Sequence, residues 1–284
     1  MLKQRVITAI IIAAAFISAL ILLSPISFSI MTAVVVTYAA WEWSDLSGIS
    51  NKLVKLFYAL SVALLLVLSG YALGLTIPIS RPEPLNLDTS KLLMVWLAPW
   101  WALALLWVQG YPSSAVLWGS CWVRGVIGYL VLVPAWLALV ILIHTTQGEW
   151  LIFIVVLIVA LADIGAYFSG RKFGKHKLAP YVSPKKTWEG LWGGIATNIL
   201  LVIVLGLLLK LNSAQWLMLL GMVLITVLAS VLGDLLESMV KRHRGIKDSG
   251  NILPGHGGIL DRIDSLTAAL PVFTLVFIYS NFQL

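Results

Sequence analysis

Long apolar runs separated by short polar segments dominate this chain. The runs fall near residues 6–23, 26–41, 53–79, 92–109, 125–143, 151–168, 189–209, 216–236 and 264–281. A membrane-spanning helix needs about 20 mostly apolar residues. The pattern therefore predicts an all-α, polytopic integral membrane protein with about nine transmembrane helices, and we expect no β-strand.

Two of these runs need a decision. No charge occurs between Leu92 and Val123, and we divide this stretch into two helices at Gly110-Tyr111-Pro112 because glycine and proline punctuate helices. The first run follows Lys3 and Arg5, as in a signal peptide. Its apolar core exceeds the 7–15 residues of a typical signal core. We therefore expect it to remain as a helix.

Composition supports a membrane protein. Apolar residues make up 60% of the 284 residues, charged residues only 11%, and the mean hydropathy is +0.99. Soluble domains contain about 25% charged residues. These values exclude a soluble globular domain and a disordered chain, and the single cysteine, Cys121, excludes a disulfide scaffold.

The few charges predict how the chain is oriented. With the N-terminus in the cytoplasm, 16 of the 19 Lys and Arg residues fall in cytoplasmic segments. Such a bias is the usual positive-inside pattern. It explains the net charge of +7 without a nucleic-acid partner, and we expect none. We divide the chain into N-terminal helices, residues 1–150 with about five spans, and a catalytic transmembrane region, residues 151–284, with two basic cytoplasmic loops.

Acidic residues concentrate at helix ends in the second half. Seven of the twelve acids lie between residues 163 and 264: Asp163, Glu189, Asp234, Glu237, Asp248, Asp261 and Asp264. Carboxylates near a membrane are costly unless they have partners. One interpretation is that each acid pairs with a nearby Lys or Arg, as the spacing of Glu237 and Lys241 allows. The alternative is a shared cation.

A shared cation would be a hard divalent ion, since only oxygen ligands are clustered. We predict a Mg²⁺ site at Asp163, Asp234, Asp261 and Asp264. No Cys or His spacing suggests zinc. On the predicted orientation, these carboxylates meet in one shallow pocket at the cytoplasmic face.

The first basic loop, residues 170–190, holds six Lys or Arg residues together with His176. A positive-inside signal alone would explain a bare run of charge. This loop also contains the segment Ser183-Pro-Lys-Lys-Thr187, whose hydroxyls and ammonium groups suit phosphate. We therefore predict substrate binding by Ser183, Lys185, Lys186 and Thr187.

The second basic loop, residues 238–265, contains five glycines between Gly245 and Gly258. Glycine lets the backbone approach a ligand closely, and successive N–H groups bind anions. We predict that this loop binds phosphates through Lys241, Arg242, Lys247, His256, Gly257, Gly258 and Arg262. His256 could instead be a loop histidine bonded to the backbone. The Walker A pattern is absent.

Polyphosphate, divalent metal and bilayer thus coincide at one place. These features indicate phosphoryl-type chemistry on a lipid head group. They do not identify the nucleotide or the lipid.

One segment carries a specific family resemblance. Over the 27 residues from Ser238 to Asp264, the chain resembles the phosphatidate cytidylyltransferases, also called CDP-diacylglycerol synthases. The matching positions are Ser238, Lys241, Arg242, Lys247, Asp248, Gly250, Pro254, His256, Gly257, Gly258, Asp261, Arg262 and Asp264. The segments at Asp163–Tyr167, Ser183–Thr187 and Gly233-Asp234 also look like this family.

The resemblance implies that CTP and phosphatidate react to give CDP-diacylglycerol and diphosphate, with Mg²⁺ as the cofactor and K⁺ as a candidate second cation beside it. It also implies a homodimer in the bacterial inner membrane, in phospholipid biosynthesis, with an active site facing the cytoplasm. Asp234, Asp261, Asp264, Lys247 and Asp248 would then be catalytic, Asp248 by orienting Lys247.

Two rival functions remain open at this point. A CDP-alcohol phosphotransferase also uses clustered aspartates, but its Asp-Gly-x-x-Ala-Arg motif is absent. A transporter of an anionic lipid would place charges along a path through the bilayer. In this chain the charges gather at one predicted face instead.

Overall fold

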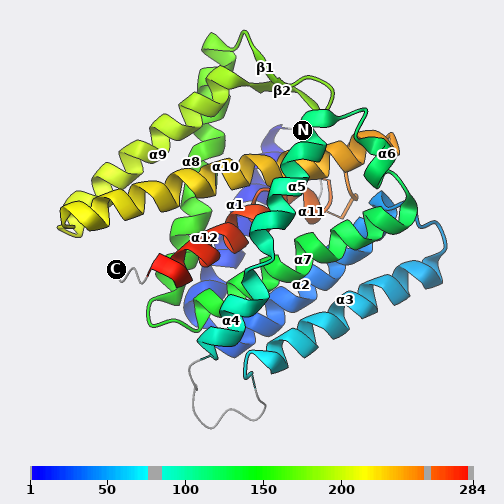
Figure 1. Cartoon of the computed structure of the whole chain (residues 1–284), viewed down its shortest axis with the longest axis horizontal. Helices are drawn as coiled ribbons and strands as arrows, with labels where there is room; N and C mark the ends of the chain where they lie inside the picture. Colours follow the sequence, from blue (N-terminus) through cyan, green and yellow to red (C-terminus); the bar gives the residue numbers. More distant parts are fainter. Residues whose placement is uncertain (1, 76–84, 253–256, 281–284) are drawn as a thin grey trace.

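The computed structural model describes residues 2–75, 85–252 and 257–280, without the side chains of residues 2–6. Helices form nearly all of the secondary structure in these ranges (Figure 1). Seven long helices are apolar enough to cross a membrane, and two shorter apolar helices occupy Ile7–Leu22 and Leu266–Ser280. Each predicted run overlaps a described helix or, for 92–109, a pair of helices, whereas residues 76–79 of the third run and residue 281 of the last lie outside the described residues. The all-α membrane class is therefore confirmed, and the number of spans stays a prediction.

The helices are bounded as follows in the described part of the chain: α1 (Leu2–Leu22), α2 (Pro25–Leu46), α3 (Lys52–Ala72), α4 (Leu87–Met94), α5 (Leu97–Gly110), α6 (Ala115–Trp118), α7 (Cys121–Ile143), α8 (Gly148–Phe173), α9 (Trp188–Leu208), α10 (Ser213–Arg244), α11 (Leu260–Ile263) and α12 (Leu266–Ser280). The predicted division at Gly110 is correct, since α5 ends there. The run predicted at 92–109 is α4 followed by α5, which together make one candidate span.

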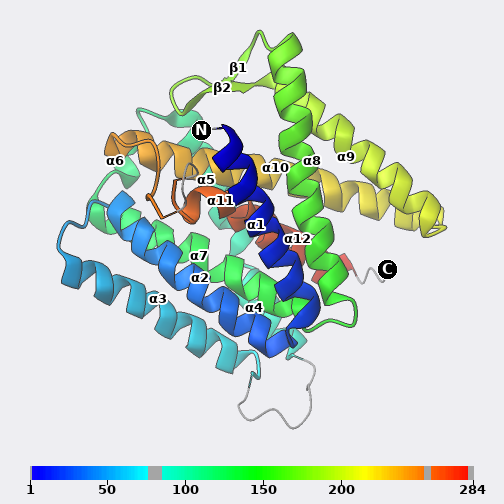
Figure 2. The ribbon, with the colours of Figure 1, turned by 180° about the vertical axis from the view of Figure 1, so that it is seen from behind.

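The expectation of no β-strand is wrong. Strands β1 (Lys177–Ala179) and β2 (Ser183–Thr187) form a short antiparallel hairpin at one end of α8 and α9, with Lys177 opposite Thr187 (Figures 1 and 2). A turn with a hydrogen bond from Val182 N to Ala179 O at 3.2 Å joins them. These strands have three and five residues and carry lysines, so they give no apolar signal in the sequence.

Helices α8 and α9 pack closely because small residues line their contact. A Cβ on Gly194 would lie 2.8 Å from Ala162 O, so only glycine allows this approach. The Thr197 hydroxyl donates to Leu161 O at 2.9 Å, and the Asn198 amide donates to Ile158 O at 3.2 Å. Such polar contacts between helices are common in membrane bundles. These contacts hold together the two helices that the hairpin connects.

Helix α10 brings much of the chemistry together. At 1.5 Å per residue its 32 residues span about 48 Å, more than the hydrocarbon core of a bilayer. An Asn212–Gln215 capping box starts it, and Gly245 with φ +75° ends it. Its last turn carries Lys241, Arg242, His243 and Arg244, which complement the helix dipole.

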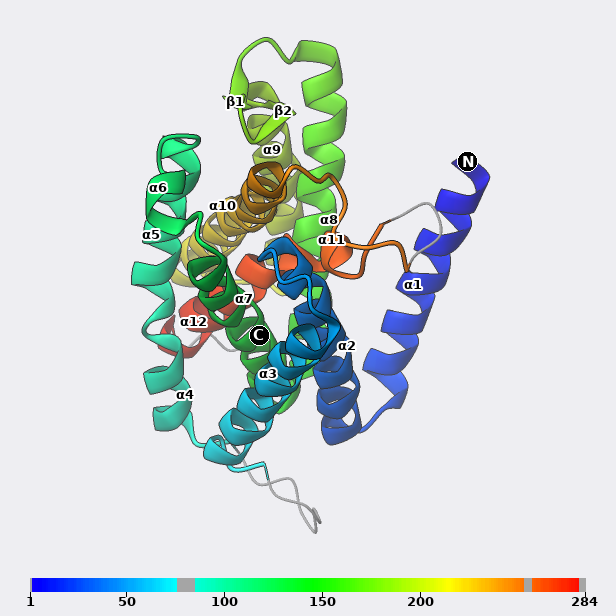
Figure 3. The same cartoon turned by 90° about the vertical axis from the view of Figure 1, so that its right-hand side faces the viewer.

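The N-terminal helices surround the segment that follows α10. Helices α2, α3 and α7 pack together, and the Trp43 indole donates to Arg124 O at 2.8 Å. Figure 3 shows α1 at one side of the molecule, with α5 and α6 at the other. The end of α10, α11 and the start of α12 lie between them.

Candidate active site

The site is built around a lysine that joins two elements. Lys241 is buried, and its ammonium donates to Glu237 Oε1 at 3.0 Å and to Asp261 Oδ1 at 2.7 Å. Glu237 and Lys241 are four residues apart on α10, whereas Asp261 lies on α11. The Glu237–Lys241 pair that the spacing allows is therefore present. Lys241 serves here as an internal counter-ion.

A second lysine joins the hairpin to α10. Lys186 of β2 pairs with Asp234 Oδ2 at 2.7 Å, and the Ser238 hydroxyl donates to Asp234 Oδ1 at 3.0 Å. Both charged side chains are about one quarter exposed. Asp163, an exposed residue of α8, has Lys186 and Asp234 as its charged neighbours. Three segments far apart in the sequence thus meet at Asp234.

Asp264 lies between α11 and α12, beside the same part of α10. A Cβ on Gly233 would lie 2.6 Å from Asp264 O, so glycine permits this approach. Asp264 Oδ1 accepts a hydrogen bond from Ser265 N at 2.7 Å. Burial, with the neighbouring Asp234 carboxylate, raises the pKa of Asp264 to about 7. We call Asp234, Glu237, Asp261 and Asp264 the acid cluster.

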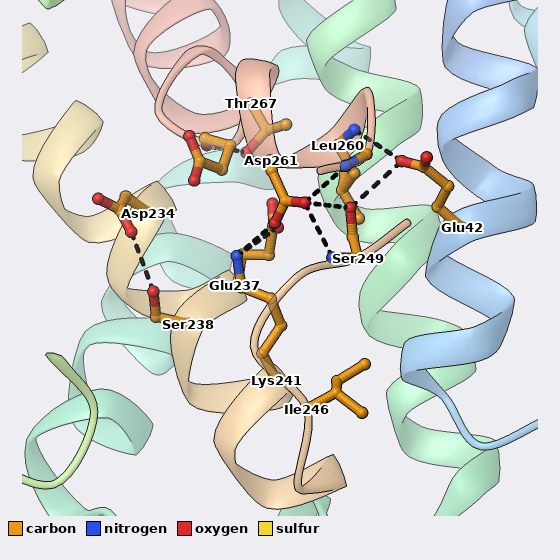
Figure 4. A network of polar contacts seen from close by, with 12 residues as sticks. Glu42, Asp234, Glu237, Ser238, Lys241, Ile246, Ser249, Leu260, Asp261 and Thr267 are labelled. Carbon is orange, nitrogen blue, oxygen red and sulfur yellow. Dashed lines mark hydrogen bonds and ion pairs between the residues drawn. The ribbon is translucent and has the colours of Figure 1, made fainter. Parts of the chain in front are cut away.

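We call the described residues 245–252 and 257–258 the glycine-rich loop, and this loop contacts Asp261. Asp261 Oδ2 accepts hydrogen bonds from Ser249 N at 2.9 Å, the Ser249 hydroxyl at 3.0 Å and Gly258 N at 2.8 Å (Figure 4). Burial raises the pKa of the Asp261 carboxyl, but the Lys241 ammonium and these amides outweigh it and hold the pKa below its ordinary value. Asp261 therefore shapes the loop as well as the acid cluster.

The loop requires glycine at position 257. Gly257 has φ +81°, and a Cβ there would lie 2.6 Å from Asp261 Oδ2. Gly258 donates its N–H to the same oxygen, so both predicted phosphate-binding glycines face Asp261. His256 lies outside the described residues, and its predicted contact stays a prediction.

The sequence reasoning missed Glu42 of α2. This carboxylate is only 3% exposed and accepts hydrogen bonds from Ile259 N at 3.1 Å and Leu260 N at 2.8 Å. The first half of the chain contains four acids, Glu42, Asp45, Glu83 and Asp88, and no local motif distinguishes Glu42 from the others. The available signal was a carboxylate directly after the apolar run 26–41, which is a functional hint in a membrane protein.

Several predicted substrate-binding residues have structural partners. The Thr187 hydroxyl accepts from Gly190 N at 3.1 Å and caps α9, and the Arg242 guanidinium donates to Val182 O at 3.2 Å. Lys185, Lys247, Asp248 and Arg262 are exposed, and Ser183 is half-buried. Lys247 and Asp248 form no ion pair with each other, so the proposed orienting role of Asp248 has no contact behind it.

Apolar cavities adjoin these polar groups. One of about 370 Å³ lies between α1, α2, α7 and α12, and Arg262 and Ile263 line it. Another of about 700 Å³ lies between α5, α9, α10, α12 and the hairpin, and Leu232 and Leu235 line it. Both extend from the neighbourhood of the acid cluster along the apolar helices.

Within the described ranges, no three His, Cys, Asp or Glu side chains are arranged closely enough to hold a metal ion by themselves. Instead, Asp234 forms an ion pair with Lys186, and Glu237 and Asp261 form ion pairs with Lys241. The donors are nonetheless oxygens of the type that Mg²⁺ prefers, and Mg²⁺ usually takes one or two carboxylates and completes its shell with substrate phosphates and water. The residues therefore fit this ion in donor chemistry, with a substrate completing the site.

Comparison with known sequences decides the family. The sequence pattern that defines the Cytidylyltransferase family matches residues 3–280, nearly the whole chain. The chain belongs to this family. The match confirms the resemblance drawn from residues 238–264 and makes the protein a nucleotidyltransferase.

Bacterial relatives of this family align over almost the full length. Phosphatidate cytidylyltransferase of Pseudomonas aeruginosa is 44% identical over 274 residues, 96% of each chain. Phosphatidate cytidylyltransferase of Haemophilus influenzae is 39% identical over 291 residues, 98% of this chain and 99% of its own. The enzyme of that name from Staphylococcus epidermidis is 49% identical over 137 residues, 48% of this chain. The family's apolar helices and bacterial members indicate a multi-pass membrane protein.

Proposed function

We propose that this enzyme is a phosphatidate cytidylyltransferase, which converts CTP and phosphatidate into CDP-diacylglycerol and diphosphate in phospholipid biosynthesis. The observation that carries the proposal is the acid cluster with its two lysines, Lys186 and Lys241, in a chain that matches phosphatidate cytidylyltransferases end to end. The setting is the bacterial inner membrane, with the active site at the cytoplasmic face. The positive-inside distribution of Lys and Arg supports this face.

The reaction is an in-line displacement. A phosphate oxygen of phosphatidate attacks the α-phosphorus of CTP, a new P–O bond forms, and the bond from that phosphorus to the β-phosphate oxygen breaks. Diphosphate leaves with the electron pair. Phosphatidate is already anionic at pH 7, so no general base is needed, and positioning with charge neutralisation supplies the catalysis.

The residues divide this work between them. Asp234, Asp261 and Asp264, with Asp163 beside them, would hold Mg²⁺, which neutralises the charge of the triphosphate. The same oxygen donors suit K⁺ as a second ion. The exposed cations Lys185, Lys247 and Arg262 would bind phosphates, together with backbone N–H groups of the glycine-rich loop.

The apolar cavities suit the lipid. Arg262 lines the smaller cavity together with apolar side chains of α1, α2 and α12. A phosphomonoester on diacylglycerol has the matching polarity, an anionic head on two apolar chains. We propose that the acyl chains enter sideways from the bilayer along these helices.

The decisive experiment supplies purified enzyme in mixed micelles with CTP and phosphatidate, with and without Mg²⁺, and measures CDP-diacylglycerol and diphosphate. We expect product only when all three are present, and none after chelation until Mg²⁺ is restored. Release of CMP instead of diphosphate would indicate a CDP-alcohol phosphotransferase. Folded enzyme without any product would contradict the proposal and favour a transporter.

Oligomeric state forms a separate part of the proposal. The family resemblance implies a homodimer, and mass measurement of the purified protein in detergent tests it. A mass of one chain plus bound detergent would contradict a dimer.

A further inference from the structure

Glu42 makes an unusual set of contacts. It lies on α2 and is buried, and its described hydrogen bonds all come from the segment that joins α10 to α11. Its Oε1 accepts from Ile259 N, and its Oε2 accepts from Leu260 N and from the Ser249 hydroxyl at 3.3 Å. The donors lie 207 to 218 residues away in sequence. No Lys or Arg whose side chain the structure describes forms an ion pair with Glu42.

The same segment is shaped to receive this carboxylate. A Cβ on Gly250 would overlap Glu42 Oε1, and a Cβ on Gly258 would lie 2.6 Å from both carboxylate oxygens. Real Cβ atoms do not approach so closely, so the two glycines make the space that Glu42 fills. The loop therefore contacts the Glu42 side chain at two separate positions, Gly250 and Gly258.

Glu42 and Asp261 hold the loop together. Ser249 directs its hydroxyl toward both carboxylates, at 3.3 Å from Glu42 Oε2 and 3.0 Å from Asp261 Oδ2 (Figure 4). Asp261 takes the amides of Ser249 and Gly258, whereas Glu42 takes the next two amides along the chain. Four backbone N–H groups and one hydroxyl are thus divided between two acids.

Stability alone does not explain a buried acid here. Burying a carboxylate costs free energy, and well-packed apolar residues often serve a fold equally well. A carboxylate aimed at N–H donors does specify one backbone conformation, because each donor would otherwise be buried without a partner. What it specifies is the position of Asp261 and of the loop beside it.

We propose that Glu42 is a positioning residue of the active site, through which the N-terminal helices set the conformation of the glycine-rich loop and the orientation of Asp261. It touches neither substrate and acts through Ser249, Ile259 and Leu260. The catalytic part of this inference rests on the proposed function. The structural part stands on the hydrogen bonds.

The test compares Glu42→Gln and Glu42→Ala with Glu149→Gln. Glu149→Gln is the same substitution at an exposed acid, at the start of α8, and serves as the control. Turnover should fall by about 10- to 100-fold in Glu42→Gln, as is usual when a supporting partner of a site is lost, and further in Glu42→Ala. Glu149→Gln should match the parent enzyme. KM and kcat are measured for CTP and for phosphatidate, and we expect the loss in kcat with the KM for phosphatidate within about twofold.

Amide hydrogen exchange supplies a second readout that needs no activity. The amides of Ser249 and of 258–260 should exchange at least about tenfold faster in both Glu42 variants, whereas those of α7 should not change. The proposal would be overturned if the Glu42 variants turned over substrate as fast as the parent enzyme, or if their loop amides exchanged at the parent rate. It would also be overturned if the loss of turnover were fully explained by a smaller fraction of folded protein. If the parent enzyme makes no CDP-diacylglycerol, the proposed function fails, and the exchange result still decides whether Glu42 positions the loop.

Discussion

Charged side chains of this site have more than one partner. Asp261 binds Lys241 with one oxygen and three loop donors with the other, and Asp234 binds Lys186 and Ser238. A carboxylate that accepts several hydrogen bonds stays ionised and keeps a fixed orientation. Asp234 and Asp261 therefore hold their carboxylates in defined orientations before any substrate arrives.

Removing that charge should stop the chemistry. We expect Asp234→Asn and Asp261→Asn each to lower turnover by at least about 100-fold, because the amide loses the charge. Asp261→Asn should also lose stability, since its NH2 group replaces an oxygen that accepts a hydrogen bond. Product formation and thermal unfolding of the purified variants measure both effects. Near-parent activity in either variant would remove that residue from the metal site, and Glu149→Gln serves as the unaffected control.

Lys241 should matter to stability as well. Lys241→Met leaves Glu237 and Asp261 buried without their shared cation, and breaking such a buried pair costs about 3–5 kcal/mol. The free energy of unfolding in detergent measures this loss. Adding Glu237→Gln to Lys241→Met should recover part of it, since one uncompensated charge is removed. A double variant less stable than Lys241→Met would contradict this account.

Elements meet at this site through small residues. Gly233 lets α10 approach the junction of α11 and α12, and Gly194 lets α9 approach α8. These contacts set the distances between Asp234, Asp264 and the hairpin. The geometry of the site therefore depends on helix packing more than on any single loop.

A pair of glycines on one helix tests this view. In Gly233→Ala the new Cβ would lie 2.6 Å from Asp264 O, whereas a Cβ on Gly221 of the same helix would meet nothing within 4 Å. We expect Gly233→Ala to lose at least about 1 kcal/mol of unfolding free energy and most of its turnover. Gly221→Ala should be neutral or gain up to about 1 kcal/mol, as helix propensity allows. Equal effects of the two changes would contradict the packing argument.

The helices could be predicted from the sequence because an apolar run of this length commonly forms a helix in a bilayer, where every backbone polar group needs an internal partner. Sequence reasoning also reached the acid cluster, since Asp234 and Asp261 carry a marked local pattern. It missed the hairpin, whose strands are short and polar, and Glu42, whose partners are more than 200 residues away. It predicted phosphate binding for Lys241, which stays a prediction, and it did not foresee the contact of Lys241 with Asp261, because sequence spacing does not reveal a partner from another element.

At the scale of the whole molecule, the predicted orientation places two basic loops and the acid cluster at one face. The start of α7 should lie at the same face, since Arg124 falls between the fourth and fifth predicted runs, a segment that is cytoplasmic when the N-terminus is inside. Cys121, the single cysteine of the chain, begins this helix and is exposed. It is therefore a natural reporter of sidedness.

We expect a membrane-impermeant maleimide to label Cys121 in inverted membrane vesicles and not in right-side-out vesicles. Labelling after detergent permeabilisation confirms that the thiol is reactive in both preparations. Labelling of right-side-out vesicles alone would reverse the predicted orientation of the chain.

The contact between Glu42 and the backbone at Ile259 and Leu260 has a consequence for biogenesis. Ribosomes add roughly 5–20 residues per second, so α2 emerges roughly 10–45 s before its partners exist. Until then this acid has none of the loop donors that it contacts in the finished protein. Glu42 is thus inserted well before the residues that donate hydrogen bonds to it, so the contact between α2 and the segment after α10 is among the last to form during synthesis.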